Sequence, residues 1–204
     1  MAGIILGGTM ASTTHLLYLH GFRSSPQSTK ARQFEARVRE RHPGVHWWCP
    51  QLPPSPRVAM EMLVAGTAGW PSGRMAVVGS SLGGFYATCV AQAAGCKAVV
   101  LNPAVHPARD LAKYIGEQTS WHDPAERFFF EPHFVDQLRE LETGPLTHPE
   151  KFFAVIAKGD EVLDWREMTA RYAGARIKLL EGGDHALSDF PDHMDEVFGF
   201  LDLA

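Results

Sequence analysis

The chain has 204 residues, which suffice for one well-buried core but are few for two domains, so we expect a single domain over residues 15–204. Hydrophobic residues make up 45% of the chain and charged residues 21%, as in ordinary soluble globular proteins. The net charge of −4 gives no reason to expect nucleic acid or an anionic membrane as a partner, and no run reaches the roughly 18 apolar residues of a membrane span.

The cysteines Cys49, Cys89 and Cys96 are odd in number, lie in apolar surroundings and lack CxxC spacing. This pattern predicts buried thiols in a reducing compartment. The run Ile4-Ile5-Leu6 is too short for a secretory signal and follows no Lys or Arg, so we expect a cytoplasmic location. Residues 1–14 lack hydrophobic periodicity and are expected to form a loose N-terminal extension.

Short apolar runs alternate with helix-compatible segments along most of the chain. The strand-like runs are residues 16–19, 45–49, 75–78, 98–101, 152–156 and 177–180. The helical segments are residues 28–41, 57–68, 82–94, 132–141, 165–172 and 194–201. The alternation predicts an α/β domain of three layers, in which helices cover both faces of a mostly parallel sheet.

A Gly-x-Ser-x-Gly motif, Gly79-Ser80-Ser81-Leu82-Gly83, lies between one of these strands and the next helix. In such a turn the central serine takes a strained backbone conformation that exposes its hydroxyl above the sheet. The five letters alone also fit a Gly/Ser loop without chemistry. The flanking strand and helix favour the first interpretation, so Ser81 is the candidate nucleophile.

A serine hydroxyl becomes a nucleophile when an imidazole accepts its proton and an acid orients that imidazole. His185 follows the last strand-like run in a glycine-rich loop, at the sheet edge where Ser81 is expected. Asp160 follows the run at 152–156 after a glycine and can turn toward His185. Asp164 is the alternative acid, but it directly precedes a helix and suits the role of N-cap. We therefore assign Asp160 as the acid.

An oxyanion formed at Ser81 needs two backbone N–H donors. One is expected from Leu82, at the start of the helix after the nucleophile, and the other from Phe22, in the loop after the first strand. The residues around Phe22 are expected to contact substrate, namely His20, Gly21 and Arg23.

The alternation of strands and helices lapses between Asn102 and Glu150, where Pro, His and aromatic residues are frequent. Open α/β sheets bind ligands at the carboxyl ends of their strands, so an insertion there is placed to cover a site. We expect residues 103–150 to form a small cap, with Phe128 and Phe129 lining an acyl pocket. The alternative is that these phenylalanines only anchor the insertion to the core.

Acidic and histidine side chains near the C-terminus also resemble a metal site. The residues are Asp184, His185, Asp189, Asp192 and His193. Carboxylates and histidines near a helix start are more often caps and surface charges, so we predict no metal and no cofactor.

Five motifs resemble the YqiA-type bacterial esterases of the α/β-hydrolase superfamily, over about Leu16 to Leu201. They are Tyr18-Leu19-His20-Gly21-Phe22 with Ser24-Ser25-Pro26-x-Ser28-x-Lys30-Ala31, Gly79-Ser80-Ser81-Leu82-Gly83-Gly84, Asn102-Pro103-Ala104-Val105, Gly159-Asp160-Glu161-Val162-Leu163-Asp164 and Glu181-Gly182-Gly183-Asp184-His185. The order Ser81, Asp160, His185 is the one that α/β-hydrolases use. The resemblance implies an α/β-hydrolase fold and a small cytoplasmic serine esterase or thioesterase, with acyl esters and acyl-CoA as candidate substrates. The N-terminal extension and residues 121–130 depart from the family pattern, so substrate choice is not implied.

Three functions remain open at this point. The first is hydrolysis of a small-molecule acyl ester or thioester through an acyl-enzyme. The second is acyl transfer to an acceptor other than water, which uses the same residues. The third is a noncatalytic binding module, against which the complete set of Ser81, Asp160 and His185 argues.

Overall fold

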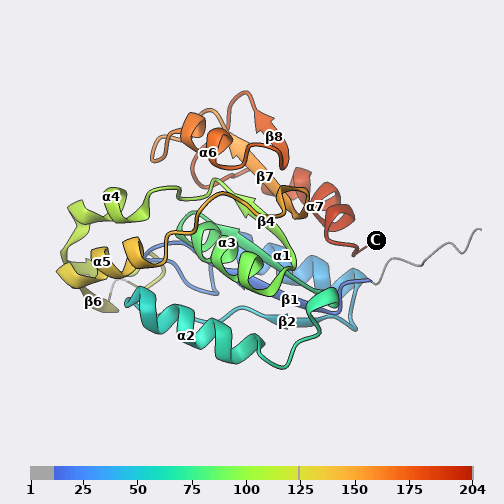
Figure 1. Ribbon diagram of the computed structural model, residues 1–204, viewed down its shortest axis with the longest axis horizontal. Coiled ribbons are helices and arrows are strands. Elements are labelled where there is room, and N and C mark those ends of the chain that lie inside the picture. The colour runs from blue at the N-terminus through green and yellow to red at the C-terminus, as the bar shows by residue number, and fades with distance from the viewer. Residues whose placement is uncertain (1–11, 124, 204) are drawn as a thin grey trace, which may run out of the picture.

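The computed structural model describes residues 12–123 and 125–203, so most of the expected N-terminal extension, residues 1–11, lies outside the described residues. At its centre is a six-stranded sheet in the order β2-β1-β3-β4-β7-β8, in which every neighbouring pair is parallel (Figure 1). The strands are β1 (His15–Leu19), β2 (His46–Trp48), β3 (Met75–Ser80), β4 (Lys97–Leu101), β7 (Phe152–Ala157) and β8 (Arg176–Leu180). This order places β3, which leads into Ser81, in the interior of the sheet.

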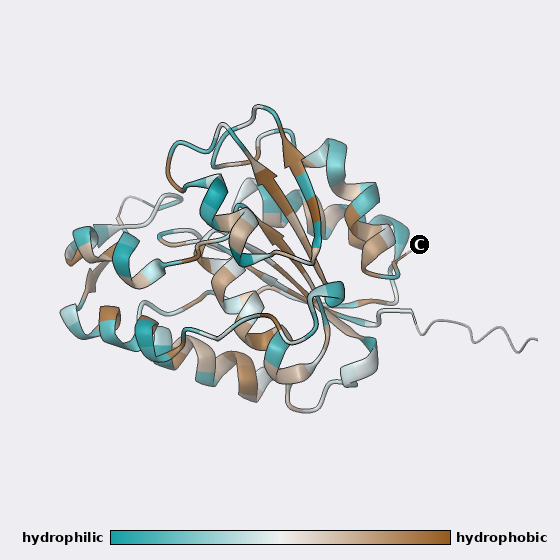
Figure 2. Cartoon of the chain, turned by 45° about the horizontal axis from the view of Figure 1, so that its top comes forward, coloured by the Kyte–Doolittle hydropathy of each residue, from teal (hydrophilic) through white to brown (hydrophobic). Residues whose placement is uncertain are grey.

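Helices cover both faces of the sheet. The helices α1 (Thr29–Arg41) and α7 (Met194–Phe200) pack on one face, and α2 (Pro56–Thr67), α3 (Leu82–Ala94) and α6 (Trp165–Arg171) pack on the other. Strand side chains alternate between the two cores, as Val77 and Val78 do on β3. Figure 2 shows the resulting pattern, with hydrophobic strands enclosed by helices that carry hydrophilic residues. The predicted three-layer α/β fold is confirmed.

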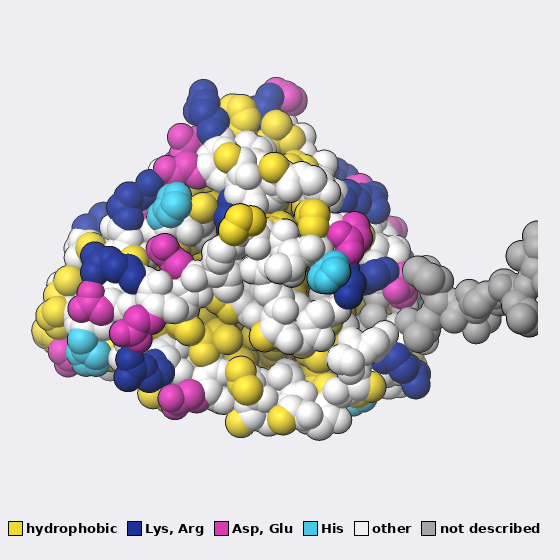
Figure 3. Space-filling view, viewed as in Figure 1, with side chains coloured by type: hydrophobic (Ala, Val, Ile, Leu, Met, Phe, Trp, Pro, Cys, Tyr) yellow, Lys and Arg dark blue, Asp and Glu magenta, His cyan; other side chains and the backbone are white. Residues whose placement is uncertain are grey.

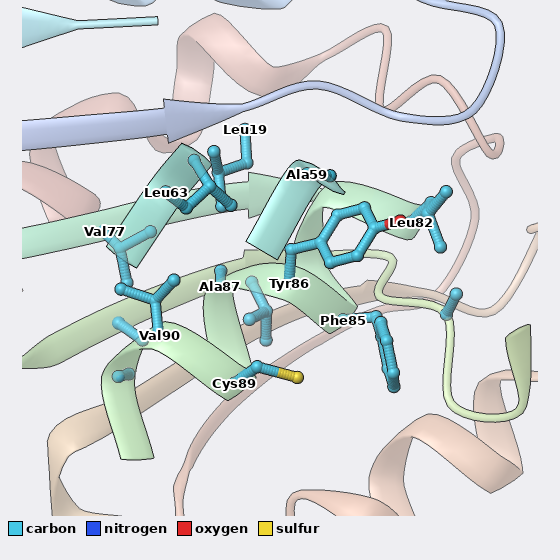
Figure 4. Close-up of a cluster of buried hydrophobic side chains, with 14 of the residues drawn as sticks. Leu19, Ala59, Leu63, Val77, Leu82, Phe85, Tyr86, Ala87, Cys89 and Val90 are labelled. Atoms are coloured by element: carbon cyan, nitrogen blue, oxygen red, sulfur yellow. The ribbon is translucent and has the colours of Figure 1, made fainter. Parts of the chain in front are cut away.

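The helix α3 fixes the position of the turn that contains Ser81. Its side chains are buried from Leu82 to Ala91, between the sheet and the helix α2. In Figure 4, Val90 of α3 lies beside Val77 of β3, and Tyr86 of α3 lies beside Ala59 of α2. Burying a large aliphatic or aromatic side chain stabilises the fold by about 1.5–3 kcal/mol. The turn between β3 and α3 is therefore anchored on both sides.

Local sequence signals explain where several helices begin and end. The hydroxyl of Ser28 accepts a hydrogen bond from the backbone of Ala31, and Ser55 caps α2 in the same way. Gly95 ends α3 with a φ of 66°, in the left-handed region that glycine adopts without steric cost. The helices predicted from the sequence all form, with boundaries that differ by a residue or two.

The insertion contains more regular structure than the sequence predicts. It comprises the helices α4 (Pro107–Leu111) and α5 (Pro132–Glu140) and an antiparallel hairpin of β5 (Gly116–Thr119) and β6 (Arg127–Phe130). Short 3-10 turns complete the chain, namely η1 (Ser72–Arg74), η2 (Ala112–Tyr114), η3 (Pro149–Lys151) and η4 (Phe190–His193). The hairpin is hidden in the sequence because Gly116-Glu117-Gln118-Thr119 has no apolar alternation.

The expectation of a loose extension is wrong for Thr13 and Thr14. Thr13 is buried, and its hydroxyl donates to the carbonyl of Leu201 at 2.5 Å. The backbone N–H of Thr14 donates to the carbonyl of Arg74 at 2.8 Å. Both threonines therefore fasten the start of β1 to neighbouring segments. Within the described part of the chain, no helix combines the length and apolar character that crossing a membrane requires.

Candidate active site

The turn at Ser81 has the geometry of an exposed serine between strand and helix. Ser81 has φ 56° and ψ −122°, a conformation that costs a non-glycine residue roughly 1–3 kcal/mol. The two glycines of the motif allow this turn to be tight. A Cβ at Gly79 would lie 2.1 Å from the carbonyl oxygen of Gly83, and a Cβ at Gly83 would lie 2.1 Å from that of Leu19. Only glycine fits at either position.

Three side chains that are distant in sequence form one hydrogen-bonded chain. Nε2 of His185 lies 3.0 Å from Oγ of Ser81, and its Nδ1 lies 2.8 Å from Oδ2 of Asp160. An ionised carboxylate can only accept a hydrogen bond, so Asp160 selects the tautomer in which Nδ1 of His185 carries the hydrogen and donates to it. The lone pair of Nε2 then faces the hydroxyl of Ser81.

The Asp160 carboxylate is fixed by further bonds. Its side chain is fully buried, whereas that of His185 is 21% exposed. Its second oxygen, Oδ1, accepts the backbone N–H groups of Val162 and Leu163, each at 2.8 Å. Asp164 does not take part, because its half-exposed carboxylate accepts the N–H of Arg166 at the start of α6. Of the two aspartates, the structure brings Asp160 to the histidine.

The loop after β1 passes directly over the serine. A Cβ at Gly21 would lie 3.2 Å from the Cβ of Ser81, so glycine permits this close approach. His20 is buried, and burial lowers its pKa to about 4. Its Nδ1 donates to the carbonyl of Gly21 at 3.0 Å, and its Nε2 accepts the N–H of Leu52 at 3.1 Å. Both ring nitrogens bind the protein, so His20 holds the loop and has no free nitrogen for substrate.

The two backbone N–H groups that the sequence suggests as oxyanion donors have no acceptor among the described residues. Leu82 is the first residue of α3, and Phe22 lies in the loop after β1. Neither N–H donates to another residue that the structure describes. The ring of Phe22 packs on those of Phe128 and Phe130 at centroid distances of 5.9 and 5.3 Å, which restrains the loop.

Ser81 and His185 open onto a cavity of about 400 Å³. One wall is polar and basic and includes Arg23, Ser28 and Lys30. Another part of the wall is apolar, and the insertion supplies much of it, with Pro107, Leu111, Tyr114 and Trp121. A cavity of this size and composition suits a small ligand with an apolar portion.

The predicted contacts of the insertion need a correction. Phe128 and Phe129 are not among the residues that line the cavity. Side chains alternate along β6, so Phe128 faces Phe22 and the core while Phe129 is 53% exposed. Phe128 anchors the insertion, as the alternative interpretation holds. The wall residue that the sequence does not identify is Trp121, over whose ring the Arg23 guanidinium lies at 4.1 Å.

Two of the acidic residues near the C-terminus, Asp184 and Asp189, are engaged in other bonds. The Asp184 carboxylate accepts the N–H and the hydroxyl of Ser188, and these bonds lower its pKa. Asp189 lies 3.3 Å from Nε2 of His193. Over residues 12–123 and 125–203, no group of three or more His, Cys, Asp or Glu side chains is arranged to hold a metal ion.

Two further residues beside the site have no role assigned from the sequence. Lys30 lines the cavity and donates to the carbonyl of Ala186, and Asn102 donates to the carbonyls of Asp184 and His185. Both belong to motifs shared with the YqiA-type family. One sequence feature could have pointed to Asn102, namely its position directly after the strand β4, which pairs with β3.

Comparison with known proteins identifies the family and the fold. Residues 15–202 match the model of a family described as Uncharacterised protein family (UPF0227), which agrees with the predicted YqiA-type resemblance. The structure is similar to α/β hydrolase domain-containing protein 10 from mouse, with a TM-score of 0.68 and 15% identity over 93% of this chain and 91% of that one.

Two further solved structures are also similar. Est1E from Butyrivibrio proteoclasticus with bound ferulic acid has a TM-score of 0.65 and 13% identity, over 97% of this chain and 90% of that one. The esterase Pf2001 of Pyrococcus furiosus has a TM-score of 0.59 and 16% identity, over 93% and 80%. At such identities these likenesses establish the α/β-hydrolase fold and nothing further.

Proposed function

The chain belongs to the UPF0227 family, and we propose that it is a serine hydrolase that cleaves carboxylic esters or thioesters of acyl groups. The observation that carries the proposal is the hydrogen-bonded chain from Ser81 through His185 to the buried carboxylate of Asp160. This arrangement supplies a nucleophile, a base and the acid that orients the base. The similar structure of the Pyrococcus furiosus esterase Pf2001 supports the same reaction class.

The reaction begins when Oγ of Ser81 attacks the acyl carbon and its proton passes to Nε2 of His185. Asp160 keeps the imidazole oriented and stabilises the imidazolium. The N–H groups of Leu82 and Phe22 donate to the oxyanion of the tetrahedral intermediate. The bond from the acyl carbon to the leaving oxygen or sulfur then breaks, and His185 gives its proton to that atom.

Deacylation repeats these steps with water as the nucleophile. His185 accepts a proton from water, hydroxide adds to the acyl carbon, and the ester bond to Ser81 breaks as Oγ regains its proton. The products are a carboxylic acid and the free enzyme. Transfer to another acceptor uses the same residues, so the ratio of free acid to transferred acyl group distinguishes hydrolase from transferase.

The cavity and the surface support a small-molecule substrate. The apolar wall formed by Pro107, Leu111 and Tyr114 suits an acyl chain. Figure 3 shows basic and acidic side chains intermixed on the face it displays, without the basic stripe that nucleic acid favours. The free cysteines Cys49, Cys89 and Cys96 support the predicted reducing, cytoplasmic compartment.

Active-site labelling tests the proposal. A fluorophosphonate reacts with base-activated serines, so we expect one adduct, located on Ser81 by peptide mass spectrometry. Ser81→Ala should abolish it, and Ser72→Ala, in η1 away from the cavity, should not. No adduct, or an adduct at another residue, contradicts the assignment and favours a noncatalytic binding protein. A screen of p-nitrophenyl esters of graded length beside acyl-CoA thioesters then identifies the leaving group and the acyl length.

A further inference from the structure

We propose that Asn102 and Lys30 are positioning residues that hold the loop carrying His185, and that they thereby set the reactive geometry at Ser81. The proposal rests on the proposed function of Ser81 and His185. The geometry that supports it is a row of three consecutive backbone carbonyls, at residues 184, 185 and 186, each of which accepts a side-chain donor from a distant segment.

Asn102 holds the first two carbonyls. Its Nδ2 donates to the carbonyl of Asp184 at 2.9 Å and to that of His185 at 3.3 Å, while its Oδ1 accepts the N–H of Ala157 at 2.8 Å. The residue is fully buried and has a φ of 40°, which asparagine tolerates better than most residues. The side chain therefore ties the end of β7 to the histidine loop, and it needs both a donor and an acceptor to do so.

Lys30 holds the third carbonyl. Its Nζ donates to the carbonyl of Ala186 from the first turn of α1, at the wall of the cavity. Burial lowers the pKa of this ammonium to about 8, although the nearby Asp184 and Asp160 favour its charged form. Lys30 is only partly buried and this bond is exposed to solvent, so the contact with Ala186, and not burial, fixes the position of the ammonium.

The histidine loop requires such contacts because its own structure is irregular. Neither helix nor strand occurs between the end of β8 at Leu180 and the turn η4 at Phe190. Two glycines precede His185, and Gly183 has a φ of 85°, so the backbone has more freedom to lose than in a regular element. The N–H of His185 donates to Oε2 of Glu161 at 3.0 Å, which restrains the loop further. A displacement of about 1 Å at a reacting group can cost roughly 100-fold in rate.

The experiment measures hydrolysis of p-nitrophenyl acetate, a small neutral ester, by Lys30→Met, Lys30→Arg and Asn102→Ala. We expect Lys30→Met and Asn102→Ala to lower kcat by about 10- to 100-fold with KM changed less than about 3-fold. Lys30→Arg retains a donor and should restore most of kcat. Lys97→Met is the matched control, because Lys97 also donates to a backbone carbonyl, that of Phe200, at the other end of β4. It should lower stability without lowering kcat.

The His185→Ala background separates positioning from general destabilisation. A residue that acts only by placing His185 has nothing left to place in that background, so adding Lys30→Met should leave the residual rate unchanged. An equal loss in both backgrounds, or an unchanged kcat in folded Lys30→Met, overturns the proposal. If Asn102→Ala does not fold, the Lys30 variants decide the outcome. Full activity in Ser81→Ala would instead overturn the proposed function, whatever Lys30 does.

Discussion

Asp160 and Asp164 are the same type of residue and lie four positions apart, but their surroundings give the two carboxylates different roles. Asp160 is withdrawn from solvent and binds the imidazole of His185, whereas Asp164 is half exposed and caps α6. Sequence reasoning separates them because a carboxylate directly before an amphipathic helix is a natural N-cap. Which of the two carboxylates contacts His185 depends on how segments distant in sequence pack together. Variants of both aspartates therefore test the assignment.

Exchanging each aspartate should produce opposite signatures. We expect Asp160→Asn to lower kcat by roughly 10³- to 10⁴-fold with a small change in stability, because an amide favours the wrong imidazole tautomer. Asp164→Ala should cost on the order of 1 kcal/mol of unfolding free energy and change kcat much less. The measurements are kcat and the thermal midpoint of both variants. A large kcat loss in Asp164→Ala with a nearly active Asp160→Asn would reverse the assignment.

His20 makes the stability of the fold depend on pH. Its pKa is lowered by burial from an ordinary 6.5 to about 4, so the folded state binds this proton less readily than the unfolded state does. The stabilisation is fully present above about pH 6.5 and is lost as pH falls toward 4. Between pH 7 and pH 5 the loss from this one group should be about 2 kcal/mol.

Urea unfolding at pH 7 and pH 5 tests this. The His20→Gln variant should lose most of that pH dependence, although its stability at pH 7 should also fall. His148→Gln, which replaces an exposed histidine, should keep it. If His20→Gln keeps the full pH dependence, the dependence arises from other groups.

At the scale of elements, helix α3 lies so close to the end of β1 that one methyl group should decide whether it fits. A Cβ at Gly83 would lie 2.1 Å from the carbonyl of Leu19, and backbone cannot move aside cheaply. We expect Gly83→Ala to destabilise the protein by at least about 1–3 kcal/mol. In α7, a Cβ at Gly199 would contact nothing within 4 Å, so Gly199→Ala should be neutral or stabilise by up to about 1 kcal/mol. Urea unfolding of both variants measures the contrast, and equal effects would contradict the close approach of α3 to β1.

The main strands and helices could be predicted because each carries its own signal. The run from Leu16 to Leu19 is apolar throughout, as a strand buried on both faces requires, and Gly95 marks the end of α3. The hairpin of β5 and β6 could not be predicted, because β5 has no apolar alternation and the contact of Phe128 with Phe22 joins segments that are distant in sequence. The expectation that Phe128 and Phe129 line the cavity is wrong because an apolar run does not reveal which of its residues faces inward.

At the scale of the whole molecule, a parallel sheet explains why the candidate site is readable from the sequence. Ser81, Asp160 and His185 each follow a strand, and the carboxyl ends of parallel strands meet at one edge. Lys30 instead approaches that edge from the start of a helix, and its contact with Ala186 spans 156 positions. No local pattern encodes such a contact, so the arrangement that holds the histidine is visible only in three dimensions.

The same sheet divides the interior into two hydrophobic cores, and each core has at least one cysteine in it or packed against it. Cys89 and Cys96 belong to the core beneath α2, α3 and α6, while Cys49 packs against the core beneath α1 and α7. Burial raises the pKa of each thiol to about 12, so the reactive thiolate is scarce in the folded state. Reaction with a disulfide reagent should therefore require the protein to open.

Single-cysteine variants can show whether the two cores unfold together. Both cores use side chains from the same strands, so losing one should expose the other, and we expect one cooperative transition. Each variant keeps either Cys49 or Cys96 and is labelled with Ellman's reagent at rising urea concentrations. Near the midpoint, the opening free energies from the two variants, and their slopes against urea concentration, should then become equal. Cys49 is only partly buried, so at low urea it should react faster through local openings. Two curves that remain parallel and separate up to the midpoint would mean that the face covered by α1 and α7 opens on its own, and that the sheet does not couple the two cores.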